Sequence, residues 1–354
     1  MTRGIRGSAG DGSVWIHAPR PRSHDAVAAL SRVLSHVLSR AASPGYPAFR
    51  ALSRASTRRR SVAAMSQLFS SLVSTQWLAD HLGADDLVVL DATVTPVAGG
   101  FTSGIDAHLV GGHLPGARFA CLLEEFSDPA GRFGFARPDA SRFARAAREL
   151  GVDDGSTVVV YDAAAGQWAA RLWWLFRSYG FERVAVLDGG LGAWHAEGRA
   201  IEFGYTVPPT AGQLTLVERP DAWVDAAEVE RISRGEAAGR LVCSLPRAEF
   251  VGEAGPRPRN GHIPASANVP FGSLRDRESG RYREGDALAA ALAPALEGDP
   301  ERVVLYCASG IAASGTALAL TLAGFDDVAV YDGGLNEWVA DADRPVLAPA
   351  ASTA

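Results

Sequence analysis

An internal repeat limits what this chain can fold into more than any other feature of its sequence. Three segments of the first half have counterparts in the second half. VVVYD at 158–162 matches VVLYC at 303–307, GFERVAVLDGGLGAW at 180–194 matches GFDDVAVYDGGLNEW at 324–338, and HLP at 113–115 matches HIP at 262–264. The separations are 145, 144 and 149 residues, and such steady spacing indicates two copies of one domain.

Each copy alternates short apolar runs with stretches that have the periodicity of a helix. Runs such as VVVY are typical of strands covered on both faces, and helices between such strands supply right-handed crossovers. The sequence therefore predicts an α/β protein with two tandem domains, each a mostly parallel sheet flanked by helices. The expected strands are 87–90, 157–161 and 183–187 in the first copy and 240–243, 302–306 and 327–331 in the second, with helices at 168–178 and 313–322.

The repeat and the composition together divide the chain into four parts. We expect the first domain at 65–200, a linker at 201–221 and the second domain at 222–346. The linker contains GYTVPPTAG, which is rich in turn-forming residues. Residues 1–64 are interpreted as an N-terminal extension that lacks the pattern of a folded domain.

The N-terminal extension differs from the rest of the chain in charge. Residues 1–64 hold eleven arginines and two acidic residues, a local charge of +9. Because the whole chain has a net charge of -6, the remaining residues are net −15. We therefore expect the body of the protein to repel nucleic acid, and any anionic ligand to need a local arginine cluster. The extension is a transit peptide, a disordered basic tail or the product of a misplaced start codon, with Met65 as the alternative start.

Composition excludes several classes of protein. The chain has no lysine, so all 34 basic residues are arginine, which excludes a pyridoxal phosphate Schiff base and a Walker A phosphate loop. No apolar run approaches the roughly 18–20 residues that span a bilayer. Three scattered cysteines, Cys121, Cys243 and Cys307, fit neither a disulfide framework nor a zinc site. We expect a cytoplasmic protein with no metal, no cofactor, and no nucleic-acid or membrane partner.

The two copies differ at the strand end where ligands bind in such sheets. The first copy has DAAAGQWAA from Asp162 and the second has CASGIAASG from Cys307, so only the second carries a nucleophile. A cysteine between a strand and a helix can lie among inward-pointing N–H groups at the positive end of the helix dipole, which favours its thiolate. The alternative is an inert core cysteine, as we expect for Cys121 and Cys243. A cysteine phosphatase is excluded because Ala313 stands where that chemistry needs arginine.

The loop and the repeated motifs resemble the tandem-domain rhodanese family, and within it the 3-mercaptopyruvate sulfurtransferase branch. The resemblance covers about residues 72–345 and rests on the GH(L/I)P motifs, the YDGGLNEW ending and the CASGIAA loop. It implies a catalytic second domain and an inactive first domain that completes the cleft. It also implies that Cys307 takes sulfur from a small anionic donor as a persulfide and passes it to cyanide, a thiol or a thioredoxin-like protein. The loop residues that would surround the donor are Ala308, Gly310, Ile311 and Ala312.

The resemblance further implies a relay that handles the thiol proton of the donor. Ser309 in the loop, His113 in the first GH(L/I)P motif and Asp106 upstream of it are the candidate members. An imidazole suits proton transfer near neutral pH. The alternative for His113 is a structural role in which it pins a turn by hydrogen bonding, as expected for His262.

The segment 243–262, CSLPRAEFVGEAGPRPRNGH, departs from the family pattern. Cys243, Leu245 and Glu249 stand where the resemblance implies an aspartate, an arginine and an arginine that grips the substrate carboxylate. The arginines that can replace the gripping pair are Arg257 or Arg259 for the second and Arg247 for the first.

Two kinds of function therefore stay open. The first is an enzyme that transfers sulfur from 3-mercaptopyruvate, or from thiosulfate as a rhodanese does. The second is a catalytically weak module that binds or relays sulfur, because the substrate segment departs from the pattern. The CASGIAA loop has no arginine to stabilise the sulfite that thiosulfate leaves behind, and this favours 3-mercaptopyruvate as the donor.

Overall fold

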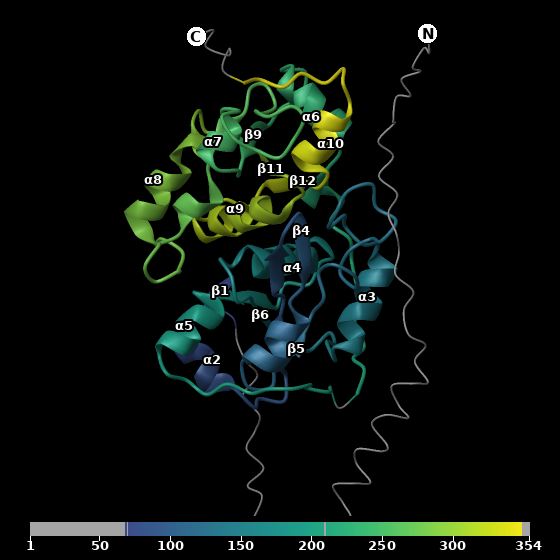
Figure 1. Ribbon diagram of the computed structural model, residues 1–354, viewed down its shortest axis with the longest axis vertical. Helices are drawn as coiled ribbons and strands as arrows, with labels where there is room; N and C mark the ends of the chain where they lie inside the picture. Colours follow the sequence, from purple (N-terminus) through teal and green to yellow (C-terminus); the bar gives the residue numbers. More distant parts are fainter. Residues whose placement is uncertain (1–67, 69, 209, 349–354) are drawn as a thin grey trace, which may run out of the picture. The chain divides into compact units, whose positions relative to one another are not determined.

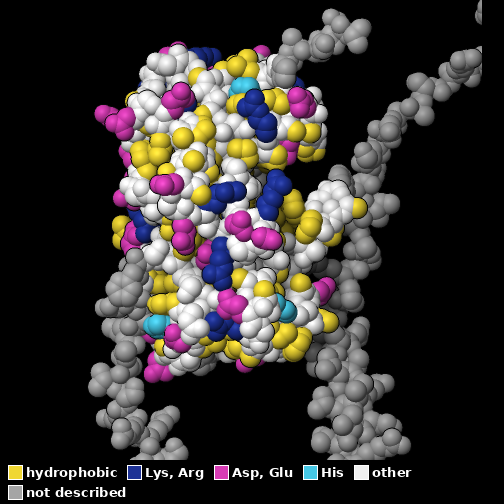
Figure 2. Space-filling model, turned by 90° about the vertical axis from the view of Figure 1, so that its left-hand side faces the viewer, with side chains coloured by type: hydrophobic (Ala, Val, Ile, Leu, Met, Phe, Trp, Pro, Cys, Tyr) yellow, Lys and Arg dark blue, Asp and Glu magenta, His cyan; other side chains and the backbone are white. Residues whose placement is uncertain are grey.

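The computed structural model describes residues 68, 70–208 and 210–348. The predicted extension 1–64 and the alternative start Met65 lie outside the described residues. Among the residues described, no helix is long and apolar enough to span a bilayer, and no three His, Cys, Asp or Glu side chains gather in a group that fits a metal ion. Figure 2 shows arginine and acidic side chains interspersed over one face of the molecule.

The first copy is built on a five-stranded sheet in which every pairing is parallel. The strands are β1 (Leu72–Val73), β2 (Leu87–Asp91), β5 (Arg118–Phe119), β6 (Thr157–Tyr161) and β7 (Val184–Leu187). Their spatial order is β1-β7-β6-β2-β5, so that β6 is central. A separate antiparallel hairpin, β3 (Val94–Val97) and β4 (Gly100–Ser103), follows β2.

The second copy repeats this arrangement. Its strands are β8 (Trp223–Val224), β9 (Arg240–Cys243), β10 (Ala267–Asn268), β11 (Val303–Tyr306) and β12 (Val328–Tyr331). Their order is β10-β9-β11-β12-β8, which is the order of the first copy read from the other edge, and all pairings are parallel. The predicted α/β class with two mostly parallel sheets is confirmed, and each expected strand begins and ends within one residue of its prediction.

Helices flank both sheets. They are α2 (Thr75–His81), α3 (Ala140–Glu149), α4 (Gln167–Ser178) and α5 (Gly190–Ala196) in the first copy, and α6 (Ala226–Ser233), α7 (Arg247–Phe250), α8 (Gly285–Leu296), α9 (Ile311–Leu322) and α10 (Gly334–Ala340) in the second. Short turns of π or 3₁₀ helix lie at Ala107–Gly111, Pro220–Ala222 and Phe271–Leu274. Polar side chains cap the N-termini of several helices. At α3, for example, the Asp139 side chain accepts a hydrogen bond from Arg142 N. The predicted helices at 168–178 and 313–322 are confirmed as α4 and α9.

Helices α4 and α9 pack on each other between the two sheets (Figure 1). Both helices are buried on nearly all sides, and α4 contributes the fully buried Trp173 and Phe176. A helix that is buried all round belongs to a core rather than to a surface. Gly315 of α9 lies so close to the Phe271 ring that a Cβ there would be 2.3 Å from it. One cluster of buried hydrophobic side chains extends through both copies.

Candidate active site

Cys307 occupies the carboxyl end of the central strand of the second sheet. Strand β11 pairs with β9 on one side and with β12 on the other. Residues 307–310, hereafter the Cys307 loop, lead from β11 into α9. Gly310 precedes the helix with a φ of 74°, a conformation that glycine adopts without strain. Cys307 itself is only 2% exposed.

The first copy shows what the equivalent loop can hold. Asp162 follows β6 as Cys307 follows β11, and it is fully buried. Its carboxylate accepts four hydrogen bonds of 2.8–3.0 Å from the backbone N–H groups of Ala164, Gly166, Trp168 and Ala169. Burial raises the pKa of Asp162, and these donors act in the opposite direction. The loop and the first turn of α4 thus form a cradle for a negative charge.

The Cys307 loop is one residue shorter than the loop that begins at Asp162, and it ends in the same way. Gly310 and Gly166 share the left-handed conformation, with φ values of 74° and 80°, and each directly precedes its helix. An α-helix leaves its first four N–H groups without intrahelical acceptors, so the start of α9 offers the donors that α4 uses on Asp162. The cradled carboxylate was not expected from the sequence, although the alignment of Asp162 with Cys307 is a signal for it.

Backbone contacts hold the Cys307 loop against the segment that follows β12. Leu335 N donates to Cys307 O at 2.8 Å, and Asn336 N donates to Ala308 O at 3.1 Å. Gly334 permits this approach, because a Cβ there would lie 2.5 Å from Cys307 O. Of the predicted loop residues, Gly310 and Ile311 are buried, whereas Ala308, Ser309 and Ala312 are half-buried.

Arg257 is the predicted substrate arginine that the structure links to the Cys307 loop. Its side chain is 7% exposed, and Nη1 donates to Glu249 Oε2 at 3.1 Å. Nε donates to Asn336 Oδ1 at 3.2 Å, and Asn336 bonds the loop through its backbone. The Glu249 carboxylate therefore lies where an incoming carboxylate would meet the Arg257 guanidinium.

The other two predicted arginines lie in different surroundings. The Arg259 guanidinium donates to Arg344 O at 2.7 Å and to Val339 O at 3.0 Å. These carbonyls lie at and beyond the C-terminal end of α10, where a cation is favourable. Arg247 is exposed at the start of α7, with its guanidinium over the Phe250 ring. The donors of Arg259 are thus used within the fold, and Arg247 faces the surface.

Cys243 lies on the strand next to Cys307. It is the register partner of Tyr306, and it is fully buried. Burial raises the pKa of the Cys243 thiol to about 12, so it stays protonated at neutral pH. Cys121 is also buried, and all three cysteines are free. These surroundings fit the inert, packed thiols that we expect at both positions.

His113 is buried, and both of its ring nitrogens face backbone carbonyl oxygens. Nδ1 lies 2.9 Å from Leu114 O, and Nε2 lies 3.1 Å from Gly204 O. Asp106 is exposed where the π turn Ala107–Gly111 begins, and its side chain caps no N–H group of that turn. The hydrogen bonds described for His113 therefore join it to neither Asp106 nor Ser309.

A different acid and histidine are paired in the first copy. His108 Nδ1 lies 2.9 Å from Asp91 Oδ2, and both side chains are buried. The Tyr161 hydroxyl donates to the same oxygen at 3.1 Å, and the His108 ring stacks on His113 with centroids 4.0 Å apart. Sequence reasoning missed this pair. The available signal is that Asp91 ends β2, at the place that Cys243 has in the second copy.

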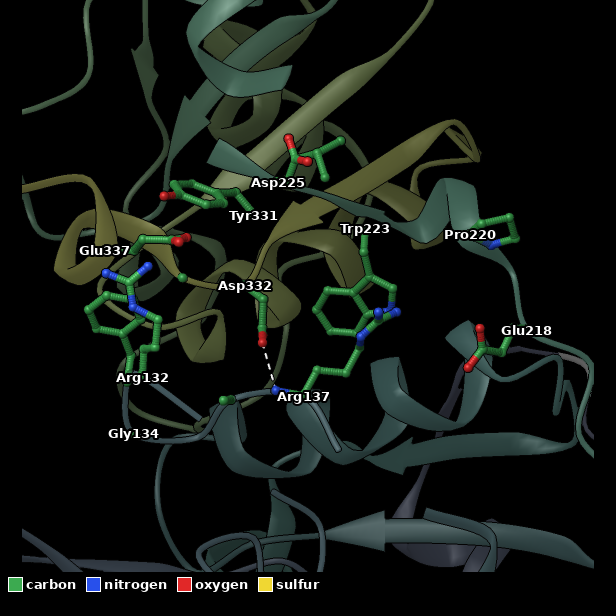
Figure 3. A pocket seen from close by; sticks show the side chains of 14 residues that line it. Arg132, Gly134, Arg137, Glu218, Pro220, Trp223, Asp225, Tyr331, Asp332 and Glu337 are labelled. Atoms are coloured by element: carbon green, nitrogen blue, oxygen red, sulfur yellow. Dashed lines mark hydrogen bonds between the residues drawn. The ribbon is translucent and has the colours of Figure 1, made fainter. Parts of the chain in front are cut away.

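A cleft of about 520 Å³ opens between the two copies (Figure 3). Residues 132–134, 136 and 137 of the first copy form one wall, and Trp223 and Asp332 belong to the other. Arg137 N donates to Asp332 Oδ2 at 2.7 Å across the cleft. The cleft adjoins the Cys307 loop, because Asp332 Oδ1 lies 3.0 Å from where a Cβ on Gly310 would be.

Comparisons with known proteins agree with this architecture. The family model of the rhodanese-like domain matches the chain twice, at residues 74–197 and 231–341. The 3-mercaptopyruvate sulfurtransferase of Escherichia coli (strain K12) is 33% identical over 278 residues, which cover 77% of this chain and 96% of that protein. The thiosulfate sulfurtransferase of Gallus gallus is 30% identical and covers 78% of this chain and 95% of that protein.

A solved structure leads to the same family. The crystal structure of SseA from Escherichia coli matches with a TM-score of 0.67 and 30% identity, covering 75% of this chain and 98% of that chain. The predicted resemblance to tandem rhodaneses is confirmed. The chain therefore belongs to the rhodanese-like family as a member with two domain copies, and it is similar over most of its length to 3-mercaptopyruvate and thiosulfate sulfurtransferases.

Proposed function

We propose that this protein transfers a sulfane sulfur from 3-mercaptopyruvate to a thiophilic acceptor through a persulfide on Cys307. The observation that carries the proposal is the correspondence between the two loops. The first copy holds the Asp162 carboxylate with four N–H groups, and the second copy has Cys307 in the same place. A thiolate and a persulfide are also anions, so a loop of this shape stabilises both.

The reaction begins with attack of the Cys307 thiolate on the sulfur of the donor. A new S–S bond forms while the C–S bond of 3-mercaptopyruvate breaks, and the electron pair of that bond stays with carbon as the enolate of pyruvate. The enolate takes up a proton and becomes pyruvate. The outer sulfur of the persulfide then passes to cyanide, a small thiol or the thiol of a thioredoxin-like protein, and the Cys307 thiolate is restored.

Two side chains near the loop have proposed roles in this reaction. Arg257 binds the donor carboxylate in competition with Glu249, because its Nη1 already pairs with that side chain. Ser309 handles the thiol proton, since it is half-buried within the loop itself. A part for His113 requires one ring nitrogen to leave its carbonyl oxygen. Arg259, Arg247 and Asp106 stay secondary candidates because of the positions described above.

The proposed setting is a reducing, cytoplasmic compartment. Three free cysteines support it, because a persulfide enzyme needs its thiol reduced before each turnover. The acceptors proposed above are small nucleophiles or a protein thiol. Nucleic acid is not among them, because the chain beyond residue 64 is net acidic.

A second candidate donor is thiosulfate, and the similarity to a thiosulfate sulfurtransferase favours it. Residues 308–313 contain no arginine that would hold the departing sulfite. Arg171 of the first copy does reach the loop, but Asp332 balances its charge at 2.6 Å. We therefore propose 3-mercaptopyruvate as the better donor.

The experiment that tests the proposal gives the protein each donor in turn, with cyanide as the acceptor. We expect thiocyanate to form with 3-mercaptopyruvate, and intact-mass and peptide analysis to find one added sulfur atom on Cys307. A protein that forms no persulfide with either donor would instead be a binding or relay module.

A further inference from the structure

Arg171 is a buried cation that the proposed reaction has not yet used. It lies in α4 of the first copy, and its side chain is 1% exposed. Nη2 pairs with Asp332 Oδ1 of the second copy at 2.6 Å and donates to Phe135 O at 2.8 Å. The guanidinium also lies 5.1 Å from the ring of Trp223. A charge buried this deeply needs partners, and most of those of Arg171 belong to the other copy.

The same guanidinium touches the Cys307 loop. A Cβ placed on Gly310 would lie 2.7 Å from Arg171 Nη1 and 3.0 Å from Asp332 Oδ1. Nη1 is buried, and it has no hydrogen-bond partner among the residues that the structure describes. The Arg171–Asp332 ion pair therefore contacts the Cys307 loop at Gly310, where the loop leads into α9. At this point Arg171 Nη1 has no hydrogen-bond partner among the described residues.

The first copy receives an arginine in the reciprocal manner. Arg275 belongs to the second copy, and its Cζ would lie 3.8 Å from a Cβ on Gly166, the counterpart of Gly310. There the loop holds the Asp162 carboxylate, and the positive charge of Arg275 acts to lower the pKa of Asp162 against the larger effect of burial. Each loop is therefore approached by an arginine from the opposite copy, and in the first copy the cradled group is an anion.

We infer that Arg171 is a positioning residue for the sulfur transfer proposed above, supplied to the copy that contains Cys307 by the copy that has Asp162 in the equivalent place. The inference rests on that proposed function. Arg171 acts through Gly310 and Asp332: it fixes the Cys307 loop in the shape that keeps its N–H groups turned toward the sulfur. The first copy thus contributes a residue that positions the Cys307 loop, in addition to forming one wall of the cleft.

The test compares Arg171→Met and Arg171→Lys with the unaltered full chain. The first readout is the rate at which iodoacetamide alkylates Cys307 as a function of pH, followed on the Cys307 peptide and without any sulfur donor. We expect Arg171→Met to move the midpoint of this profile upward by about one pH unit and to slow persulfide formation about tenfold. Arg171→Lys keeps the charge and should recover part of both effects.

The matched control is Arg177→Met, because Arg177 lies on the same helix but pairs with Glu182 at the surface. It should leave the alkylation profile unchanged. If Arg171→Met does not fold, Asp332→Asn serves as the second variant, because it breaks the ion pair from the other side; it should likewise slow persulfide formation on Cys307.

An Arg171→Met protein that melts earlier but keeps the profile and the persulfide rate would overturn the inference, since Arg171 would then only join the copies. An Asp332→Asn protein that forms the persulfide as fast as the unaltered protein would overturn it as well. Failure of the proposed function looks different: the unaltered protein would form no persulfide with 3-mercaptopyruvate, whereas the alkylation profile can be measured regardless.

Discussion

Arg257 Nη1 lies 3.1 Å from Glu249 Oε2, so the arginine proposed to bind the donor carboxylate is already paired with a carboxylate of the protein. The pair lies in the segment between β9 and β10, and Arg257 is tied through Asn336 to the Cys307 loop. A donor carboxylate that binds Arg257 must therefore displace Glu249 from the guanidinium or share the guanidinium with it. Under the proposed role of Arg257, the affinity for 3-mercaptopyruvate depends on Glu249, a residue that does not react.

Replacement of Glu249 by glutamine is expected to improve donor binding. The change frees the Arg257 guanidinium for the substrate, and a charge-assisted hydrogen bond contributes about 1.5–3 kcal/mol. Because Glu249 is partly exposed, we expect a smaller gain, with KM for 3-mercaptopyruvate lowered about three- to tenfold and kcat nearly unchanged. Steady-state kinetics measures both. Glu253→Gln, an exposed change in the same segment, is the control; an unchanged or higher KM in Glu249→Gln would count against the role of Arg257.

Replacement of Cys307 by serine is expected to abolish sulfur transfer, because a hydroxyl at the strand end forms no persulfide. Cys243→Ser and Cys121→Ser should keep most of the activity. Cys243 remains a thiol at neutral pH, since burial raises its pKa to about 12. The measurement is thiocyanate production by each variant, with circular dichroism to verify the fold. Loss of activity in a folded Cys243→Ser protein would contradict the assignment.

The donor preference follows from the loop. We expect kcat/KM for 3-mercaptopyruvate to exceed that for thiosulfate by at least about tenfold, which corresponds to about 1.4 kcal/mol. The margin is modest, because Glu249 reduces the positive charge available to a carboxylate. Rates for both donors under the same conditions decide the matter. A preference for thiosulfate would show that Arg171 or another arginine outside the loop holds the leaving sulfite.

Asp162 is expected to stabilise the first copy without taking part in the reaction. Asp162→Asn replaces one oxygen by an NH₂ group, which faces two of the four N–H donors. Unsatisfied buried donors cost about 1–3 kcal/mol each, so we expect the free energy of unfolding to fall by a few kcal/mol. Persulfide formation on Cys307 should be little changed, because the hydrogen bonds of Asp162 all lie within the first copy. Asp85→Asn, an exposed change, is the control in chemical denaturation.

The same variant tests a pH dependence whose sign follows from burial. The pKa of Asp162 is raised in the folded protein, so the native state holds the proton to higher pH than the unfolded state does. The contribution of Asp162 to stability is therefore full below its ordinary pKa and declines as pH rises through its raised folded value. The difference in unfolding free energy between the wild type and Asp162→Asn should decline over that window and be flat above it. A difference that grows with pH would contradict the direction of the shift.

A protein that begins at Met65 is expected to keep the melting temperature and activity of the full chain. The elements described begin with β1 at Leu72, and the sequence upstream of Met65 has no patterned core segment. Differential scanning calorimetry and steady-state rates of both forms make the comparison. A melting temperature that falls by many degrees would show that the arginine-rich extension stabilises the body.

The sequence by itself determined the fold and singled out Cys307 as the proposed nucleophile. The repeat with offsets of 144 to 149 residues predicted two copies, and the continuous apolar runs predicted strands with their ends nearly in place. Such features are local: a buried parallel strand needs an unbroken apolar run, and a ligand site needs the carboxyl end of that strand. Asp162 and Cys307 at equivalent positions were therefore enough to separate the two copies.

Only the tertiary structure decided which side chains surround Cys307. The pairing of Asp91 with His108 and the capping of α10 by Arg259 depend on how segments distant in sequence pack. In the sequence, Arg171 is one of several charged residues on a helix. In the structure, α4 packs against α9 and this packing places the Arg171 guanidinium next to Gly310. No periodicity encodes that contact, because the partner of a buried charge is chosen by the packing of the two copies and not by the residues beside it in the chain.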